Sequence, residues 1–406
     1  MIQSINKDRL FLGSCFALIT TAFSFSIRAG ILAQLGAQFQ LTGEQLGWIN
    51  SMWFLGFPIS MIIGGLVYYT VGPKKIMLFA FAAHAIGILM TIYATGYSTL
   101  LISTLLIGLG NGCTEAACNP MIADTYSGTD MNKMLNRFHM WFPGGIVVGS
   151  LISKFMTDGG LSWQSQIWVI LIPTITYFVL FQGQEFPKPK VEGATSITNN
   201  LKAMMSPLFI FIFCCMALTA ISEFGPQQWT GLIMSKSGAS PMLILALVTG
   251  TMAVCRYFAG SIIGTLGQTG VLLISAVLAT AGILLFATQT GTMAYVAALC
   301  FAFGVALFWP TMLGFVAEKL PQTGAFGLSI VGGVGMFSTS IFQPIIGGWL
   351  DSEKTKATAN GLTGDLAELT AGQATLDNIA IFPAILIVAF AGLFFYMKKR
   401  NVMSVA

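Results

Sequence analysis

Four charged side chains stand inside long apolar stretches of the sequence, and they are its first candidates for chemistry. They are Arg28, Glu115, Glu223 and Arg256. If these stretches cross a bilayer, each charge costs at least about 2.5–3.5 kcal/mol and is expected to face a cavity or a partner. Carboxylates accept hydrogen bonds or bind protons, and guanidinium groups bind anions. The residue types therefore suit a site that binds a polar solute.

The composition indicates that the apolar stretches are membrane helices. Of 406 residues, 55% are hydrophobic and 8% are charged, whereas a soluble domain carries roughly 25% charged residues. Continuous runs of about 20 apolar residues are typical of membrane-spanning helices, not of a β-barrel with its short alternating segments. We predict an all-α membrane protein with twelve transmembrane helices, near residues 10–33, 46–69, 76–95, 99–122, 136–156, 165–183, 207–231, 241–264, 270–288, 292–316, 325–350 and 379–397.

Basic residues predict the orientation of these helices, because cytoplasmic loops carry an excess of Lys and Arg. With both termini in the cytoplasm, most of the 19 basic residues lie inside. The polar, acidic stretch 351–378 is then expected to be an external loop. The net charge of +4 reflects this distribution and does not indicate nucleic-acid binding. The basic residues expected outside are Lys154, Lys236, Lys354 and Lys356.

Two halves with a similar pattern are expected on either side of a polar linker. Residues 184–206 read QEFPKPKVEGATSITNNLKAMMS, between a first half, 1–183, and a second half, 207–406. In each half a helix that ends in Asn-Pro or Trp-Pro is followed by a glycine-rich helix, WFPGGIVVGS and GGVGMFSTS. Parallel six-helix repeats of this kind are typical of secondary transporters.

The loop between the second and third helices, GGLVYYTVGPKK, resembles a motif of the major facilitator superfamily. The superfamily motif is G-x-x-x-D-x-x-G-R-R, and here Tyr68 or Tyr69 replaces the aspartate while Lys74 and Lys75 replace the arginines. The resemblance implies the superfamily fold of two pseudo-symmetric six-helix halves. It also implies that Lys74 and Lys75 belong to a cytoplasmic gate.

Helix 4 is similar to that of the fucose permease branch of bacterial sugar transporters. The branch carries G-x-G-x-x-E-x-x-x-N-P, and this chain reads GLGNGCTEAACNP, with Glu115 and Asn119 in the motif positions. The resemblance implies a sugar transporter with a functional carboxylate at Glu115. Ala29 stands where the branch has a proton-titrating aspartate in helix 1, so that proton step does not transfer to helix 1 of this chain.

Two interpretations stay open for each charge in helices 1 and 4. Arg28 either pins helix 1 by a salt bridge or has a functional role, as a substrate ligand or as a group that sets the charge state of Glu115. Glu115 either sits in a helix packed closely through its glycines or binds substrate or a coupling proton. We favour a pair between the two, with Glu115 as a substrate-binding and structural group. Asn111 and Asn119, four residues to either side, share its helical face and are also substrate-binding candidates.

The seventh predicted helix, near residues 207–231, carries a second polar cluster, SEFGPQQWTG. Amides such as those of Gln227 and Gln228 bind vicinal hydroxyls, and Trp229 offers a face for a sugar ring. Glu223 is a candidate substrate ligand and the other coupling candidate. The alternative is an outer-leaflet interface, where Gln and Trp meet headgroups.

The other polar residues in the predicted spans are weaker candidates for a functional role. Arg256 is interpreted as a gate residue in the inner half of helix 8, with anion binding as an alternative. His84 is expected to be hydrogen-bonded packing, and His139 a solvated residue near the inner face. Residues that line a cavity or lie at an interface include Trp309 and Gln343, which we add to the substrate-binding set, together with Gln34, Asn50, Trp53, Trp141 and Gln164.

The sequence excludes several classes of function. It contains no nucleotide-binding signature and no metal-ligand spacing, and its seven cysteines all fall in spans, so we expect no cofactor, no metal and no enzymatic activity. The leading hypothesis is a monomeric transporter of the bacterial inner membrane that moves a monosaccharide or sugar derivative, with a proton or sodium ion as a possible coupling partner. The alternative is a carrier of an organic anion that uses Arg28 and Arg256, and a remote alternative is a membrane-embedded enzyme or sensor.

Overall fold

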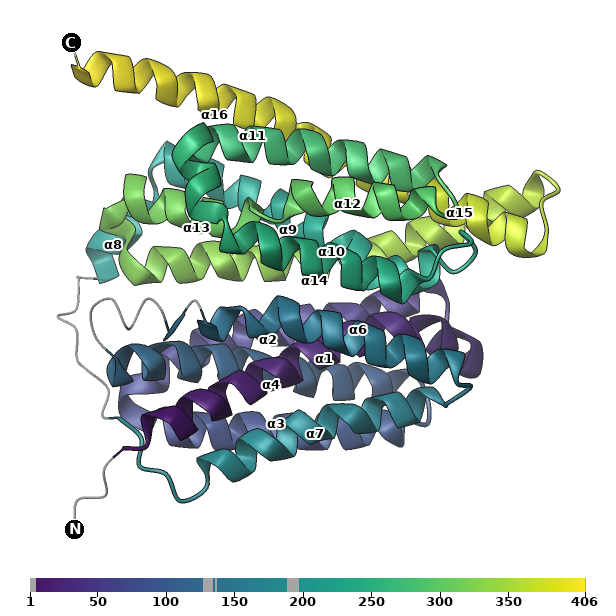
Figure 1. The fold of residues 1–406 in the computed structure, drawn as a ribbon, viewed down its shortest axis with the longest axis horizontal. Coiled ribbons are helices and arrows are strands. Elements are labelled where there is room, and N and C mark those ends of the chain that lie inside the picture. Colours follow the sequence, from purple (N-terminus) through teal and green to yellow (C-terminus); the bar gives the residue numbers. More distant parts are fainter. Residues whose placement is uncertain (1–4, 127–133, 136, 188–196, 406) are drawn as a thin grey trace. The chain divides into compact units, whose positions relative to one another are not determined.

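The computed structural model describes residues 5–126, 134–135, 137–187 and 197–405, and within these residues it is helical with no strand (Figure 1). Ten of the described helices are long and apolar enough to cross a membrane. The 18-residue helix α6 (Trp141–Asp158) and the shorter apolar helix α10 (Pro241–Tyr257) complete the set of twelve. The predicted fold class, an all-α membrane protein of twelve transmembrane helices, is confirmed.

The chain divides into two compact units, Met1–Ala194 and Thr195–Ala406. The first unit contains α1 (Lys7–Phe39), α2 (Gly43–Val71), α3 (Pro73–Ile92), α4 (Tyr97–Thr125), α6 and α7 (Trp163–Phe181). The second contains α8 (Ile197–Met204), α9 (Pro207–Ile233), α10, α11 (Ala259–Thr288), α12 (Met293–Val305), α13 (Phe308–Lys319), a short 3-10 turn (Pro321–Thr323), α14 (Gly324–Ala359), α15 (Gly364–Ile379) and α16 (Ile381–Val405).

Local sequence signals explain where several helices begin. The Thr42 hydroxyl accepts from the Gln45 N–H at 3.2 Å, and the Gln45 side chain accepts from the Thr42 N–H at 3.0 Å. This reciprocal capping box starts α2 directly after α1 has ended. Prolines occupy the first turn of α3, α9 and α10, where the missing N–H costs no intrahelical bond.

Two predicted spans are interrupted in the structure. The span predicted at 241–264 stops at Phe258, and the next helix, α11, itself kinks at Gly267, whose φ is 70°. The span predicted at 292–316 is divided into α12 and α13 around Ala306 and Leu307. Continuous hydrophobicity predicted unbroken helices, because an apolar run does not reveal where its backbone bonds are lost.

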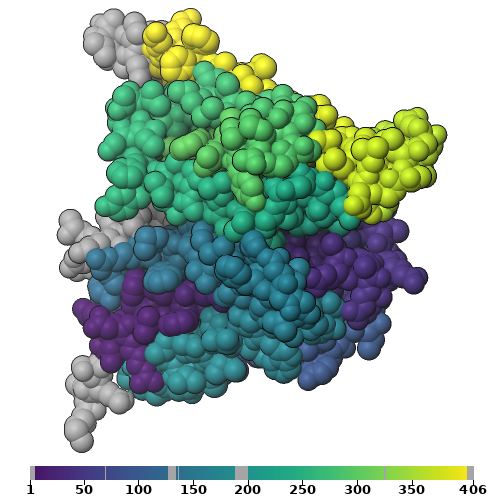
Figure 2. Space-filling model, turned by 45° about the vertical axis from the view of Figure 1, so that its right-hand side comes forward, coloured from purple at the N-terminus to yellow at the C-terminus, as the bar shows by residue number. Residues whose placement is uncertain are grey.

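The prediction that residues 351–378 form a loop is wrong, because most of the stretch is helical, while its external location stays a prediction. α14 continues to Ala359 and α15 begins at Gly364, so only a short turn separates them. Ala367, Ala371 and Leu376 bury one face of α15. In Figure 2 the tip of this hairpin, coloured yellow-green, stands away from the rest of the second unit. The predicted linker 184–206 also holds a helix, α8, while its residues 188–196 lie outside the described part of the chain.

Glycines let α4 lie against α2 at backbone distance. A Cβ on Gly112 would stand 2.1 Å from the Phe57 carbonyl oxygen, and one on Gly108 would stand 2.6 Å from the Trp53 carbonyl oxygen. These separations leave no room for a side chain. The close approach sets the distance between the helices that carry Trp53, Glu115 and the neighbouring polar residues.

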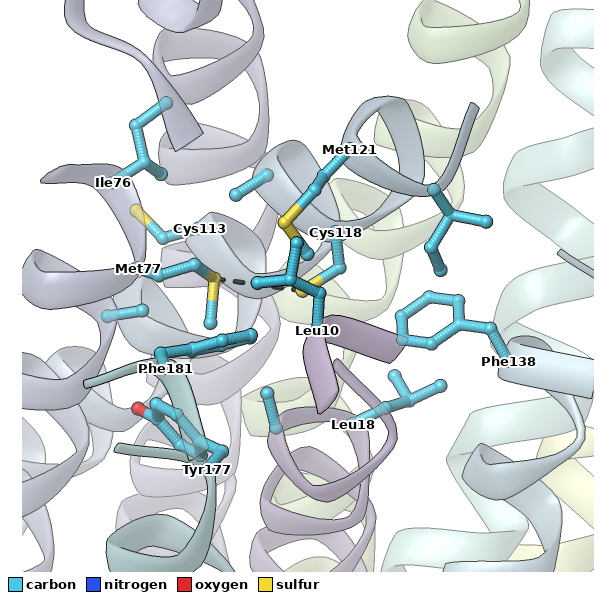
Figure 3. Packing of buried hydrophobic residues seen from close by; sticks show 14 of the residues in the cluster. Leu10, Leu18, Ile76, Met77, Cys113, Cys118, Met121, Phe138, Tyr177 and Phe181 are labelled. Carbon is cyan, nitrogen blue, oxygen red and sulfur yellow. Dashed lines mark hydrogen bonds between the residues drawn. The ribbon is translucent and has the colours of Figure 1, made fainter. Parts of the chain in front are cut away.

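An apolar cluster in the first unit fixes α1, α3, α4 and α7 around one another (Figure 3). Leu10 from α1, Met121 from α4 and Phe181 from α7 are buried in it. Cys113 and Cys118 contribute small side chains with free thiols, and the Cys118 thiol contacts the Met77 sulfur at 3.7 Å. This cluster is a packed core and not a binding surface.

Substituting Gly112 by Ala should lower the stability of the protein. The new methyl group must displace the backbone of Phe57, and overpacking of this kind costs about 1–3 kcal/mol. Gly65→Ala in α2 is the matched control, because nothing lies within 4 Å of a Cβ there. Thermal unfolding in detergent measures both variants. Equal midpoints for Gly112→Ala and the wild type would contradict the close packing of α2 and α4.

Candidate functional site

Arg28 lies inside the first unit, with 6% of its surface exposed. Its Nε donates to the Asn50 side-chain oxygen at 2.9 Å, and its guanidinium carbon stands 5.3 Å from the centre of the Trp53 ring. α1 supplies the arginine and α2 supplies both neighbours, one helical turn apart. The amide and the indole therefore both contact the guanidinium from α2.

Asn50 is only half satisfied by this contact. Its oxygen accepts from Arg28, but its Nδ2 is buried and has no hydrogen-bond partner among the described residues. Burying an amide N–H without an acceptor costs about 1–3 kcal/mol. The side chain therefore presents an unused donor beside a positive charge, and an oxyanion is the chemical complement of such a pair.

The indole N–H of Trp53 is bound by a buried polar cluster. Its Nε1 donates to the Ser24 hydroxyl at 2.9 Å, and the Asn111 amide donates to the same oxygen at 3.4 Å. The Asn111 oxygen lies 2.9 Å from Nε2 of His84, whose Nδ1 lies 3.0 Å from the Tyr177 hydroxyl. The prediction that His84 is hydrogen-bonded packing is confirmed.

Glu115 does not form the pair with Arg28 that the sequence favoured. Its carboxylate accepts from the Asn119 amide at 2.5 Å, one helical turn along α4. No ion pair joins Glu115 to Arg28 among the described side chains. The expected shared face also divides, because Asn119 joins Glu115 while Asn111 turns toward His84 and Ser24.

In the second unit Glu223 is paired with Arg256. The carboxylate of Glu223 is 3% exposed, and its Oε1 lies 3.4 Å from Nη2 of Arg256, whose side chain is 27% exposed. Nε of Arg256 donates to the Ala306 carbonyl at 3.0 Å. One guanidinium therefore joins α9 and the end of α10 to the break between α12 and α13.

Pro310 explains why the Ala306 carbonyl is available. In a continuous helix this carbonyl would accept from the N–H of residue 310, and proline has none. The backbone opens at Leu307, where φ is −107° and ψ is 0°. Arg256 supplies the missing donor from a neighbouring helix. Its predicted role in a gate stays a prediction, but its contacts are those of a group that ties three helices together.

The predicted sugar-binding run in α9 is buried. Trp229 has no exposed surface, and its Nε1 donates to the Gln343 oxygen at 2.8 Å. Gln227 contacts the Met252 sulfur through its amide at 3.6 Å, and Gln228 is buried as well. The amide nitrogen of Gln343 is buried and has no partner among the described residues. Two of the predicted residues, Trp229 and Gln343, are thus brought together from α9 and α14.

Two further predicted groups lie apart from these clusters. Trp309 is half-buried, packs edge-on to Phe224 at 6.2 Å between ring centres and lies against Gly335 of α14. Lys74 and Lys75 are exposed at the start of α3.

The aspartate missing from the loop motif has a counterpart elsewhere in the chain. Tyr68, which stands at or beside the motif's aspartate position, donates to the Asp124 carboxylate of α4 at 2.8 Å. That contact joins the ends of α2 and α4.

Sequence reasoning missed the partners that organise each cluster. Ser24 stands four residues before Arg28, so the helical repeat placed it on the same face as the charge. Ala306 stands four residues before Pro310, which marked its carbonyl as free. Asn50 was recognised only as a residue that could line a cavity. Among the described residues, no group of His, Cys, Asp and Glu could hold a metal ion.

Comparison with known proteins gives consistent matches along the chain. The model of the Major Facilitator Superfamily matches residues 14–344. NiaP of Bacillus subtilis (strain 168), named as a niacin/nicotinamide transporter, is 21% identical over 86% of this chain and 90% of its own length. The 3-(3-hydroxy-phenyl)propionate transporter of Escherichia coli (strain K12) is 25% identical over 59% of this chain and 60% of its own length.

A solved structure shares the fold over nearly the whole chain. The nucleoside transporter NupG superposes with a TM-score of 0.74. It is 15% identical and covers 96% of this chain and 98% of its own. At this identity the likeness concerns the fold alone.

Replacing both residues of the Glu223–Arg256 pair should lower the stability of the protein less than replacing Arg256 alone. Arg256→Gln leaves a buried carboxylate without its cation, which costs about 3–5 kcal/mol. The double variant Glu223→Gln/Arg256→Gln has no charge to compensate and should recover part of that loss. Thermal unfolding of the two single variants and the double variant measures the coupling. Strictly additive losses would show that the pair does not interact.

Proposed function

The chain belongs to the major facilitator superfamily, and we propose that this member carries a small organic acid across the bacterial inner membrane. Membership makes it a transporter of small solutes. Rocking of the half 1–183 against the half 207–406 would provide alternating access, as in other transporters built from parallel repeats. Such transporters bind their substrate near the middle of the membrane.

The observation that carries this proposal is the donor pair formed by Arg28 and Asn50. A carboxylate has two oxygens with several lone pairs, so it can accept from a guanidinium and an amide together. The Asn50 Nδ2 is buried and without a partner in the described structure. Binding an oxyanion there would satisfy the Asn50 donor and place a negative charge beside the guanidinium of Arg28, whereas a neutral hydroxyl brings no opposite charge to that position.

Two relatives support the same class of solute. One solute in each of the two names, niacin and 3-(3-hydroxyphenyl)propionate, carries a carboxylate on a small ring compound, while nicotinamide, the other solute in the first name, is neutral. An aromatic acid or a sugar acid meets the requirements of the donor pair. Trp53, which lies against Arg28, adds an apolar wall to this position.

A second candidate is transport of a neutral monosaccharide. Gln343 favours it, because its buried amide nitrogen has no described partner and could donate to a sugar hydroxyl. Its oxygen is fixed by Trp229, which orients the donor. The two candidates differ in the charge of the solute, so one experiment separates them.

Purified protein should bind acids better than their neutral analogues. We expect nicotinate, 3-phenylpropionate or glucuronate to raise the thermal midpoint more than nicotinamide, 3-phenylpropionamide or glucose at equal concentration, because a ligand of the folded state stabilises it. Arg28→Gln should weaken binding of the preferred acid roughly tenfold to a hundredfold, since hydrogen bonds to charged groups contribute about 1.5–3 kcal/mol.

Lys202→Gln is the control for a simple change of net charge, because Lys202 is exposed on α8. It should leave the preference for acids unchanged. A wild type that binds only the neutral sugars would replace the first candidate by the second. A preference for acids that survives Arg28→Gln would remove Arg28 from the site.

Both termini are proposed to be cytoplasmic, with the hairpin of α14 and α15 outside. Asn360 lies at the exposed turn of that hairpin. An Asn360→Cys variant should react with a membrane-impermeant maleimide on intact spheroplasts. Lys202→Cys should react only after the membrane is opened. A Cys214→Ser background removes the exposed native thiol. The reverse pattern of labelling would invert the topology.

A further inference from the structure

A continuous line of buried hydrogen bonds crosses the first unit from α7 to α2. It runs from Tyr177 through His84 and Asn111 to Ser24 and ends at the indole of Trp53. Each of the five residues comes from a different helix, and each is buried. The line ends where Trp53 faces the guanidinium of Arg28.

The donors and acceptors fit together in only one direction. The side-chain oxygen of Asn111 can only accept, so Nε2 of His84 must carry the proton in their 2.9 Å contact. In a neutral imidazole Nδ1 is then an acceptor, and the Tyr177 hydroxyl donates to it at 3.0 Å. One tautomer of His84 satisfies both neighbours.

Ser24 completes the arrangement at the other end. Its hydroxyl donates to the Thr21 carbonyl at 2.8 Å, so its oxygen is free to accept. It accepts from Nε1 of Trp53 and from the amide of Asn111. A hydroxyl oxygen has two lone pairs, and both are used. The indole is therefore fixed by a partner that cannot turn without losing two other bonds.

We propose that His84 and Asn111 are positioning residues, which hold Trp53 and through it set how Arg28 presents itself to the carboxylate of the substrate. This assignment rests on the proposed function. It differs from the expectation that Asn111 touches substrate, because both polar atoms of its amide are already used inside the bundle.

The side chains and backbone around His84 leave a closely fitting space for its imidazole. A Cβ on Gly110 would stand 2.3 Å from Cδ2 of the ring, so the glycine beside Asn111 makes room for it. The ring of Tyr177 lies edge-on to it, with 6.0 Å between ring centres. Close packing of this kind lets a small shift at His84 reach Trp53, because the interior is not easily compressed.

The first test reads the tautomer of His84 directly. The chain has two histidines, so His139→Gln leaves His84 as the only source of signal in protein labelled with ¹⁵N-histidine. Nitrogen-15 spectra should show the proton on Nε2, and the pattern should change in Asn111→Leu. A proton on Nδ1 in the unmodified network would overturn the arrangement.

The second test measures selectivity as the ratio of two affinities, for an acid and for its neutral analogue. It uses the pair for which the wild type has the largest ratio. Asn111→Leu and His84→Leu should reduce the ratio of their affinities by about tenfold, the effect of one lost buried hydrogen bond. His84→Gln keeps a donor near the position of Nε2 and should restore much of the ratio. A purely structural role would lower stability without changing the ratio.

Thr91→Val is the matched control. It removes a buried hydrogen bond between α3 and α4, from Thr91 to Ser103 at 2.9 Å, without touching the line to Trp53. It should leave the ratio unchanged. An equal loss in Thr91→Val, or no loss in Asn111→Leu, would overturn the positioning role. If the wild type binds every acid and its neutral analogue with equal affinity, the proposed function is overturned. The tautomer of His84 still tests the arrangement of the hydrogen bonds in that case.

Discussion

A polar group inside an apolar helical bundle has no water to bind, so it is costly unless another part of the chain or a bound solute satisfies it. This constraint organises both units of the protein. In the first unit a serine oxygen joins a tryptophan and an asparagine, and the asparagine joins a histidine. In the second unit an arginine satisfies both a carboxylate and a backbone carbonyl. Helix positions follow from these partnerships as much as from apolar packing.

Glycine and proline prepare the backbone for those partnerships in opposite ways. Gly108 and Gly112 bring α4 so close to α2 that Trp53 and Asn111 share one serine on α1. Pro310 instead removes an N–H and leaves the Ala306 carbonyl open to Arg256. Close approach needs residues without side chains, and a free carbonyl needs a residue without a donor. The sequence places each type where its physical property is used.

The fold could be predicted from the sequence because it depends on lengths and hydrophobicity. The twelve spans and the superfamily follow from apolar runs and from motifs such as GLGNGCTEAACNP. Pairings between side chains could not be predicted, because several partners were available for each charge. Arg28 had Glu115 as its obvious ion partner, yet Asn50 and Trp53 hold it from the adjacent helix. The break in a span was also hidden, since Ala306 and Leu307 are as apolar as their neighbours.

The two halves show how one sequence pattern leads to two local structures. Asn119-Pro120 and Trp309-Pro310 occupy similar places in their repeats, and each proline removes a donor from the carbonyl four residues earlier. α4 nevertheless continues through Pro120 to Thr125, while the second span divides into α12 and α13. In the second span, Arg256 of α10 donates to the carbonyl freed by Pro310 and so stabilises the open turn. A proline makes a break possible, and the external donor makes it persist.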